Sequence, residues 1–182
     1  KTTPTQSFYA IADGSTIGSV RGGSLVAHTY SKGADTTSTV TVDWDTQRGW
    51  YMDLPSGEQA NTRPAVARGV ITFVTNLAGA TDCAASSRLY ALDVLTGNKF
   101  DGADFVGTTI AENAMSSGVN LLLTSGTGTP GGGGGGGGGG GSEGCQHIVG
   151  SGQDADGKSW NRQITKCVSI TPSKNAWREV RR

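Results

Sequence analysis

Residues 65–75 read Ala-Val-Ala-Arg-Gly-Val-Ile-Thr-Phe-Val-Thr, and residues 88–95 read Arg-Leu-Tyr-Ala-Leu-Asp-Val-Leu. Both stretches are rich in β-branched and aromatic side chains, which favour β-strands. Residues 39–45 alternate strictly, with three large apolar side chains on one side and threonines and aspartates on the other. Alternation with a period of two predicts a half-buried strand at that place. Together these stretches predict an all-β protein.

Further short runs of the same kind occur along most of the chain, with turn-forming pairs such as Asp101-Gly102 and Asp156-Gly157 between them. The runs cover residues 7–12, 24–30, 49–54, 119–124, 145–149, 160–170 and 176–180. Only residues 109–117 read as a short helical turn. Many short strands at short spacing predict an antiparallel meander, as in a sandwich, a barrel or a propeller.

The charge balance and the lengths of the apolar runs bear on the partners. Lysine plus arginine and aspartate plus glutamate both total 15, so the formal net charge is zero. A chain without net charge has no long-range field that collects a polyanion, so we expect no nucleic acid partner. The longest apolar stretches, such as residues 70–74, fall far short of the ~20 residues of a membrane-spanning helix. We therefore expect no membrane span.

A run of eleven glycines divides the chain at residues 131–141. Ordering such a run costs about 1 to 2 kcal/mol of backbone entropy per residue, and the run has no side chains to bury in return. We therefore expect three parts: short β-strands over residues 1–130, a flexible connector over residues 131–144, and a C-terminal hairpin with a closing strand over residues 145–182.

Three segments resemble the PilY/PilC family of type IV pilus tip proteins. Residues 49–64 contain Gly-Trp-Tyr-Met-Asp-Leu-Pro, then Gly-Glu and Asn-Thr-Arg-Pro, similar to the family pattern GWYxDLP…GERV…RP. Residues 70–97 are similar to VxFTTN…DPC…WLYALDxxTG, and residues 176–180 to the terminal SWREL. The start of the chain, residues 6–11, also resembles the family's QxLYAIxD. The resemblance covers most of the chain outside residues 126–144.

The resemblance implies both a fold and a function. The C-terminal region of the family is a modified β-propeller at the tip of type IV pili, so this chain would form its last blades, with residues 1–130 as β-propeller blades. It would act in pilus assembly and adhesion by binding and not by catalysis. Minor pilins of the tip complex and, in some members, a host or surface receptor are the implied partners. The implied location is the cell surface of a Gram-negative bacterium, with the periplasm or outer membrane during assembly.

One segment also admits an enzyme reading. The phrase YALDxxTG occurs in the blades of quinoprotein dehydrogenases, so a fragment of a pyrroloquinoline-quinone enzyme is the alternative. Asp93 can bond backbone amides and Gly97 can supply a positive φ, which explains these residues as a turn. The block at residues 49–58 separates the readings, because it belongs to the pilus pattern and has no role in quinone chemistry. A lectin-like adhesin is a third reading.

No catalytic, cofactor-binding or metal-binding residue is predicted. In the family a loop that resembles a calcium site commonly follows the YALD segment. Here residues 100–105 retain only two carboxylates, so calcium binding is not supported. Asp154 and Asp156 fit a hairpin turn better than a calcium loop, because the further oxygen ligands are missing. His28 and His147 have no helically spaced partner and read as ordinary core or surface imidazoles.

The three cysteines show neither CxxC nor CxxCH spacing, which argues against zinc, thioredoxin-type and haem sites. A hairpin about Asp156 would place Cys145 opposite Cys167 and Ile148 opposite Ile164. Opposed positions have Cβ atoms ~4.5 to 5.5 Å apart, which is close to the Cβ–Cβ distance that a disulfide requires. We therefore predict a disulfide between Cys145 and Cys167, with two buried thiols as the alternative. Cys83 would stay free or pair outside this chain.

Overall fold

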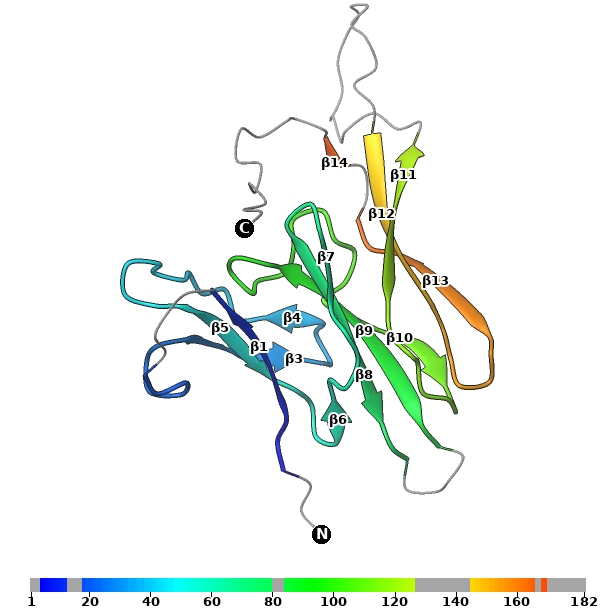
Figure 1. Ribbon diagram of the computed structural model, residues 1–182, viewed down its shortest axis with the longest axis horizontal. Helices are drawn as coiled ribbons and strands as arrows, with labels where there is room; N and C mark the ends of the chain where they lie inside the picture. Colours follow the sequence, from blue (N-terminus) through cyan, green and yellow to red (C-terminus); the bar gives the residue numbers. More distant parts are fainter. Residues whose placement is uncertain (1–3, 13–17, 80–83, 127–144, 166–167, 170–182) are drawn as a thin grey trace, which may run out of the picture.

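The computed structural model describes residues 4–12, 18–79, 84–126, 145–165 and 168–169. These residues form β-strands, turns and loops and contain no helix, which confirms the all-β class (Figure 1). The strands are β1 (Ser7–Ile11), β2 (Val26–His28), β3 (Tyr30–Ser31), β4 (Thr36–Thr37), β5 (Gly49–Asp53), β6 (Glu58–Gln59), β7 (Ala65–Ala67), β8 (Val70–Leu77), β9 (Ser86–Asp93), β10 (Gly107–Glu112), β11 (Asn120–Gly126), β12 (Cys145–Gln153), β13 (Ser159–Gln163) and β14 (Val168–Ser169).

The strands form three main sheets and one small hairpin. The first sheet has the order β1-β5-β2, with β1 antiparallel and β2 parallel to β5. The central sheet runs β7-β8-β9-β10 as a consecutive antiparallel meander, with the short β6 also paired to β8. The third sheet has the order β11-β12-β13, with β14 paired to the start of β12. Strands β3 and β4 pair with each other. Among the described residues no sheet closes on itself.

Two hydrophobic cores join the three sheets, one on each face of the central sheet. The core toward the first sheet includes Trp50, Met52, Phe73 and Tyr90. The core toward the third sheet is made by the other face of β8 and β9 together with side chains of that sheet, and its larger members are Val70, Val74, Leu89, Ile148, Trp160 and Ile164. Strand β8 is therefore buried on both faces, which explains its near-continuous apolar sequence.

Aromatic rings join the first sheet to the central sheet. Phe8 of β1 stacks on Phe73 of β8 with ring centroids 3.8 Å apart, and Phe73 in turn lies 5.0 Å from the ring of Tyr90. Tyr30, on β3 of the small hairpin, also meets Tyr90 edge to face at 5.2 Å. Such pairs add to the energy of simple area burial, and they fix how the two sheets are placed.

The strand predicted at residues 39–45 is wrong. This segment is a loop that ends in a turn, although Val42 is buried as the alternation indicated. The side chain of Asn98 binds both the amide and the carbonyl of Val40, which takes the place of a neighbouring strand. The Asp43 carboxylate accepts hydrogen bonds from the Asp45 amide and the Thr46 hydroxyl, so it favours a turn at the position where the strand would continue.

The helical turn predicted at residues 109–117 is also wrong. Residues 107–112 form β10, which pairs with β9 and carries a bulge between Thr109 and Ala111. The composition of the segment tolerates a helix, but β9 offers an unpaired edge. Tertiary pairing overrides a weak local propensity.

The run at residues 65–75 is a hairpin and not one strand. Arg68 and Gly69 have φ values of 52° and 82°, which reverse the chain between β7 and β8. Two consecutive positive φ values are typical of tight two-residue hairpin turns. An arginine in the first of these positions is not a usual turn signal, so the sequence pattern did not predict this turn.

The hairpin predicted about Asp156 is present. Its register runs as expected from Val149 opposite Gln163 to Gln153 opposite Ser159. The Asp154 carboxylate accepts hydrogen bonds from the amides of Asp156 and Lys158, and Gly157 has a φ of 79°. This confirms the interpretation of the Asp-Ala-Asp-Gly segment as a hairpin turn.

Candidate functional site

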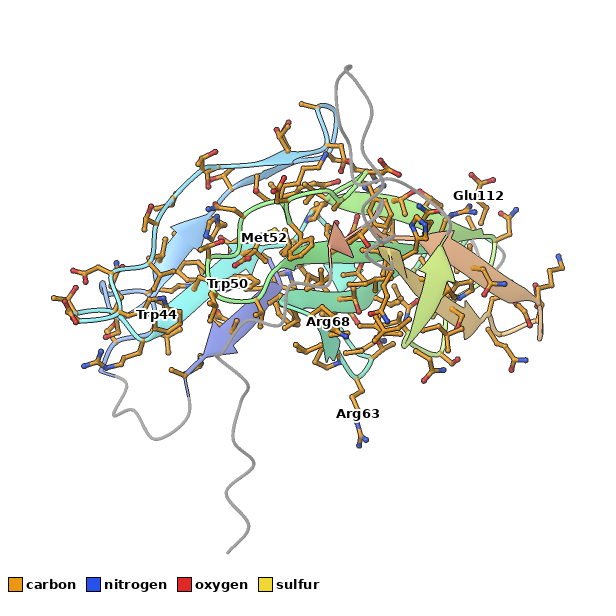
Figure 2. All side chains as sticks on the ribbon, turned by 90° about the horizontal axis from the view of Figure 1, so that it is seen from above. Trp44, Trp50, Met52, Arg63, Arg68 and Glu112 are labelled. Carbon is orange, nitrogen blue, oxygen red and sulfur yellow. The ribbon has the colours of Figure 1, made fainter. Side chains whose placement is uncertain are left out.

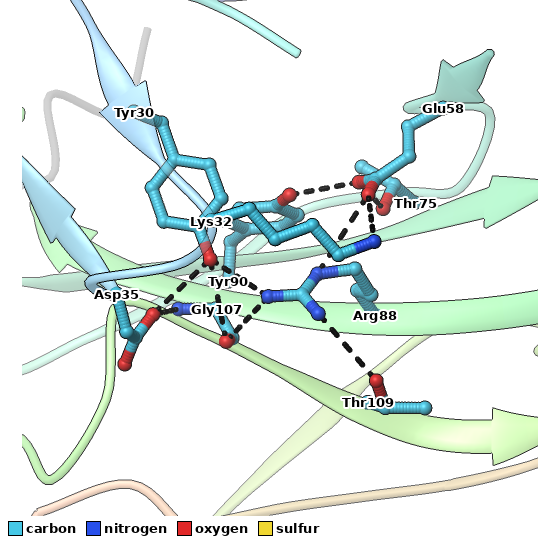
Figure 3. A network of polar contacts seen from close by, with 9 residues as sticks. All are labelled: Tyr30, Lys32, Asp35, Glu58, Thr75, Arg88, Tyr90, Gly107 and Thr109. Carbon is cyan, nitrogen blue, oxygen red and sulfur yellow. Dashed lines mark hydrogen bonds and ion pairs between the residues drawn. The ribbon is translucent and has the colours of Figure 1, made fainter. Parts of the chain in front are cut away.

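The segments that carry the family resemblance meet at the buried carboxylate of Glu58. Its Oε2 accepts hydrogen bonds from the Thr75 hydroxyl and the Tyr90 hydroxyl, each at 2.7 Å (Figure 3). Glu58 belongs to the Gly-Glu pair, Thr75 to β8 and Tyr90 to the YALD phrase of β9. Only 1% of the glutamate side chain is exposed, so these contacts replace its water.

Two cations face the second oxygen of this carboxylate. Arg88 Nε lies 3.7 Å and Lys32 Nζ 3.9 Å from Glu58 Oε1. Neither distance is a hydrogen bond, and among the described residues both Oε1 and Arg88 Nε have no hydrogen-bond partner. The two positive charges nevertheless offset part of the cost of burying the carboxylate.

Arg88 extends the network to the β3–β4 hairpin. Its guanidinium donates to the Tyr30 hydroxyl and to the carbonyl of Gly107, both at 2.7 Å (Figure 3). The Tyr30 hydroxyl donates to Asp35, whose carboxylate also accepts from the amides of Val106 and Gly107. The network therefore holds the hairpin against the central sheet.

The two tyrosines remain neutral over the physiological range. Burial raises the pKa of Tyr30 to about 12. Burial, together with the neighbouring Glu58 carboxylate, raises the pKa of Tyr90 further above its usual range. Both hydroxyls thus stay protonated donors, which suits a structural network better than acid–base chemistry near neutral pH.

A second contact joins the GWYMDLP segment to the end of the YALDxxTG phrase. The Trp50 indole donates to the carbonyl of Val94 at 3.1 Å. Asp93 accepts from the amides of Leu95 and Thr96, and Gly97 has a φ of 74°. A Cβ at Gly97 would meet the Trp50 ring at 2.6 Å, so glycine is required there by conformation and by space. These residues form a turn, as the sequence indicated.

An apolar groove opens beside this turn, at the end of β1. Its volume is about 540 Å³, and it is lined by Ala10, Ile11, Ala12, Trp44, Ile71, Val94 and Leu95. Ile11, Trp44 and Leu95 are 44%, 42% and 48% exposed. Trp44 lies at the far end of the first sheet, on the loop before β5 and apart from the core residue Trp50 (Figure 2). Large apolar side chains gathered in an open groove are typical of a binding surface.

The outer edge of β1 borders the same groove. The amide of Leu54 donates to the carbonyl of Gln6, so the even-numbered residues of β1 point their backbone groups toward β5. The backbone N–H and C=O groups of Ser7, Tyr9 and Ile11 point away from β5, to a side where no described strand pairs with them. An unpaired strand edge is a template for an added strand.

A larger and more polar groove lies between the β7 side of the central sheet and the third sheet. It has a volume of about 750 Å³, and its lining includes Arg63, Asn120, Ser151, Trp160 and Asn161. The Arg63 side chain projects away from the ribbon (Figure 2). Trp160 is buried and donates to Ser116, so its ring face is not offered to a ligand. The groove can bind through amide and hydroxyl groups.

At Cys145 the pairing departs from the hairpin register on which the predicted disulfide depends. Beyond Ile148 the pairing shifts by two residues, so Cys145 lies opposite Ser169. The shift arises where the Ile148 carbonyl accepts from the amides of both Ile164 and Thr165. Cys167, Cys83, the glycine run and residues 176–180 lie outside the described residues, and the disulfide stays a prediction.

The other residues singled out from the sequence lie apart from one another. His28 is buried in the first core beside Trp50, whereas His147 lies on β12 in the third sheet. Asp101 and Asp104 lie on the loop between β9 and β10. The described part of the chain holds no group of three side chains suited to a metal ion.

The sequence patterns did not single out the groove residues. Trp44 lies in the predicted strand 39–45 and Leu95 at the end of the predicted strand 88–95, so both have the pattern of ordinary strand residues. Two sequence features could have indicated them. Trp44 lies between two turn-forming aspartates, and Leu95 lies within an Asp-x-x-Thr-Gly turn, so neither position favours burial in a core.

Comparisons with known proteins identify no relative. No family model, no curated protein and no solved structure matches this chain. No helix in the described residues is long and apolar enough to cross a membrane.

Proposed function

We propose that this chain is part of a type IV pilus tip protein and acts in pilus assembly and adhesion by binding, without catalysing a reaction. The observation that carries the proposal is the convergence of its motif segments. The GWYMDLP, Gly-Glu, VITFVTN and YALDxxTG segments contact one another around Trp50, Glu58 and Tyr90. Their co-occurrence in the sequence thus has a physical basis in one packed unit.

The arrangement of the sheets supports a propeller-like architecture. Strands β7 to β10 form a four-stranded antiparallel meander, which is the unit of a propeller blade. The sheets on either side pack against its two faces, as neighbouring blades do. Tyr9 and Ile11 on the first sheet and Leu122 on the third remain exposed. Further layers of a longer protein would cover these side chains.

The location of the motif residues supports a binding role. Trp50, Glu58, Tyr90 and Gly97 maintain the packing of the sheets and line neither groove. The groove residues are apolar at one site and carry amides, hydroxyls and one guanidinium at the other. Such groups recognise protein segments or other surfaces by contact and hydrogen bonding.

The proposal is tested in the bacterium that encodes the chain. Deleting the whole gene should remove surface pili seen by electron microscopy, and the native gene supplied in trans should restore them. Normal numbers of fully functional pili after deletion would contradict the proposal. A visible absorbance scan of the purified protein tests the alternative, because bound quinone would identify an enzyme fragment.

A further inference from the structure

The apolar groove and the open edge of β1 form one continuous surface that a single extended segment can occupy. Ala10, Ile11 and Ala12 line the groove and belong to β1 or follow it directly. A strand added along β1 would bond the outward backbone groups of Ser7, Tyr9 and Ile11. One large side chain from that strand would enter the groove between Trp44 and Leu95.

The C-terminal segment of this chain begins close to that surface. Strand β14 is the last described part of the chain, and it pairs with Cys145 and Gln146. Gln146 accepts a hydrogen bond from Arg68 at the β7–β8 turn, and the next residue, Gly69, binds the amide of Val94 in the groove lining. Figure 1 shows β14 over the β7 hairpin. Residues 170–175 alone can span up to ~20 Å when extended.

The sequence of this segment suits the surface. Residues 176–180 read Ala-Trp-Arg-Glu-Val, which is a predicted strand with one large aromatic side chain, and two more arginines follow. Asp43 and Asp45 flank Trp44 at the rim of the groove, with Arg48 bound to the carbonyl of Trp44. The basic end of the chain therefore complements two carboxylates at the rim.

We propose that residues 176–180 bind along the open edge of β1 as an added strand, with Trp177 in the apolar groove. The first sheet would then have four strands, and its edge would be closed by the end of the same chain. This proposal does not depend on the pilus function.

Hydrogen exchange measured by nuclear magnetic resonance on the whole chain tests the proposal. The amides of Tyr9 and Ile11 should exchange at least ~100-fold more slowly than unprotected amides, because a docked strand binds them. The variants Trp177→Asp and Leu95→Asp should abolish this protection. Val66→Asp is the matched control, since Val66 is a 59% exposed apolar side chain on β7 that does not line the groove. Protected amides at Phe8 and Ala10 would show that each variant is folded.

Three results would overturn the proposal. Fast exchange at Tyr9 and Ile11 in the native chain would mean that the edge is open. Protection that survives Trp177→Asp would mean that another segment covers it. Protection that grows with protein concentration would assign the surface to a second copy of the chain.

Discussion

At the scale of single residues, the unusual feature is a carboxylate buried among hydroxyls and two cations. Glu58 has two hydroxyl donors at short distance and two positive charges slightly farther away. Removing one donor leaves a charged oxygen buried with fewer partners, which costs more than the hydrogen bond itself contributes. Stability therefore depends strongly on each member of this network.

We predict that Tyr90→Phe lowers the free energy of unfolding by about 1 to 3 kcal/mol, because the hydroxyl donor to Glu58 is lost. Urea unfolding followed by fluorescence measures the change. Tyr51→Phe is the control, since Tyr51 is partly exposed and makes no hydrogen bond through its hydroxyl among the described residues. An equal loss in both variants would contradict this account of Glu58.

The raised tyrosine pKa values predict a loss of stability at alkaline pH. Burial holds the folded pKa of Tyr30 at about 12 and that of Tyr90 higher, against an ordinary value of 10. The folded state keeps these protons after the unfolded chain releases them. The stabilising contribution is therefore complete below pH 10 and declines as the pH rises through the folded pKa of Tyr30.

Urea unfolding at a series of pH values from 9 upward measures this decline. Tyr30→Phe should show a weaker dependence on pH over the same range, because one of the two shifted groups is gone. A native protein whose stability does not change between pH 10 and 12 would refute the assignment.

At the scale of elements, the strand prediction fails where a side chain, and not a neighbouring strand, binds the backbone. Val40 has the pattern of a strand residue. However, the side-chain carboxamide of Asn98, nearly sixty residues later, binds both the amide and the carbonyl of Val40. Periodicity reports which side chains are buried, and Val42 is indeed buried. It does not report which group satisfies the backbone, because that partner is distant in the sequence.

Local turn chemistry was by contrast predictable. The Asp93 turn and the hairpin about Asp156 use an aspartate that binds nearby amides and a glycine with positive φ. All the necessary atoms lie within five residues of one another. The Arg68 turn and the pairing of β10 could not be predicted, because tertiary contacts fix both of them. The meeting of Glu58, Thr75 and Tyr90 likewise needs the folded sheet.

We predict that Asn98→Ala destabilises the protein by about 1 to 2 kcal/mol, because two hydrogen bonds to Val40 are lost. Hydrogen exchange should also become faster at the amide of Val40. Asn161→Ala, at an exposed position of β13, should leave both quantities nearly unchanged. Unaltered exchange at Val40 after Asn98→Ala would show that the loop is held in some other way.

The disulfide belongs to the same scale. We predict that protein taken from its native compartment yields a linked Cys145–Cys167 peptide on non-reducing mapping. Such a bond would stabilise by about 3 kcal/mol in the chain-entropy model. Two freely alkylated thiols would instead favour the pairing of Cys145 with Ser169 as the stable arrangement, and would remove an argument for export.

At the scale of the whole molecule, the chain is a stack of three sheets with a meander in the centre. The two outer sheets expose apolar side chains on their far faces, and β1 leaves an open edge. Under the proposed function, further layers of a longer protein would cover these faces, and the remaining surfaces would bind partners. The motif residues Trp50, Glu58 and Tyr90 lie inside the stack, where they determine its packing.

Immunogold electron microscopy tests the central claim most directly. An antibody against this chain, applied to intact cells of the bacterium that encodes it, should label the free ends of surface pili. Cells in which the gene is deleted serve as the control and should show no label. Label confined to the cytoplasm of sectioned cells, with pili unlabelled and normal in number, would contradict the proposed function.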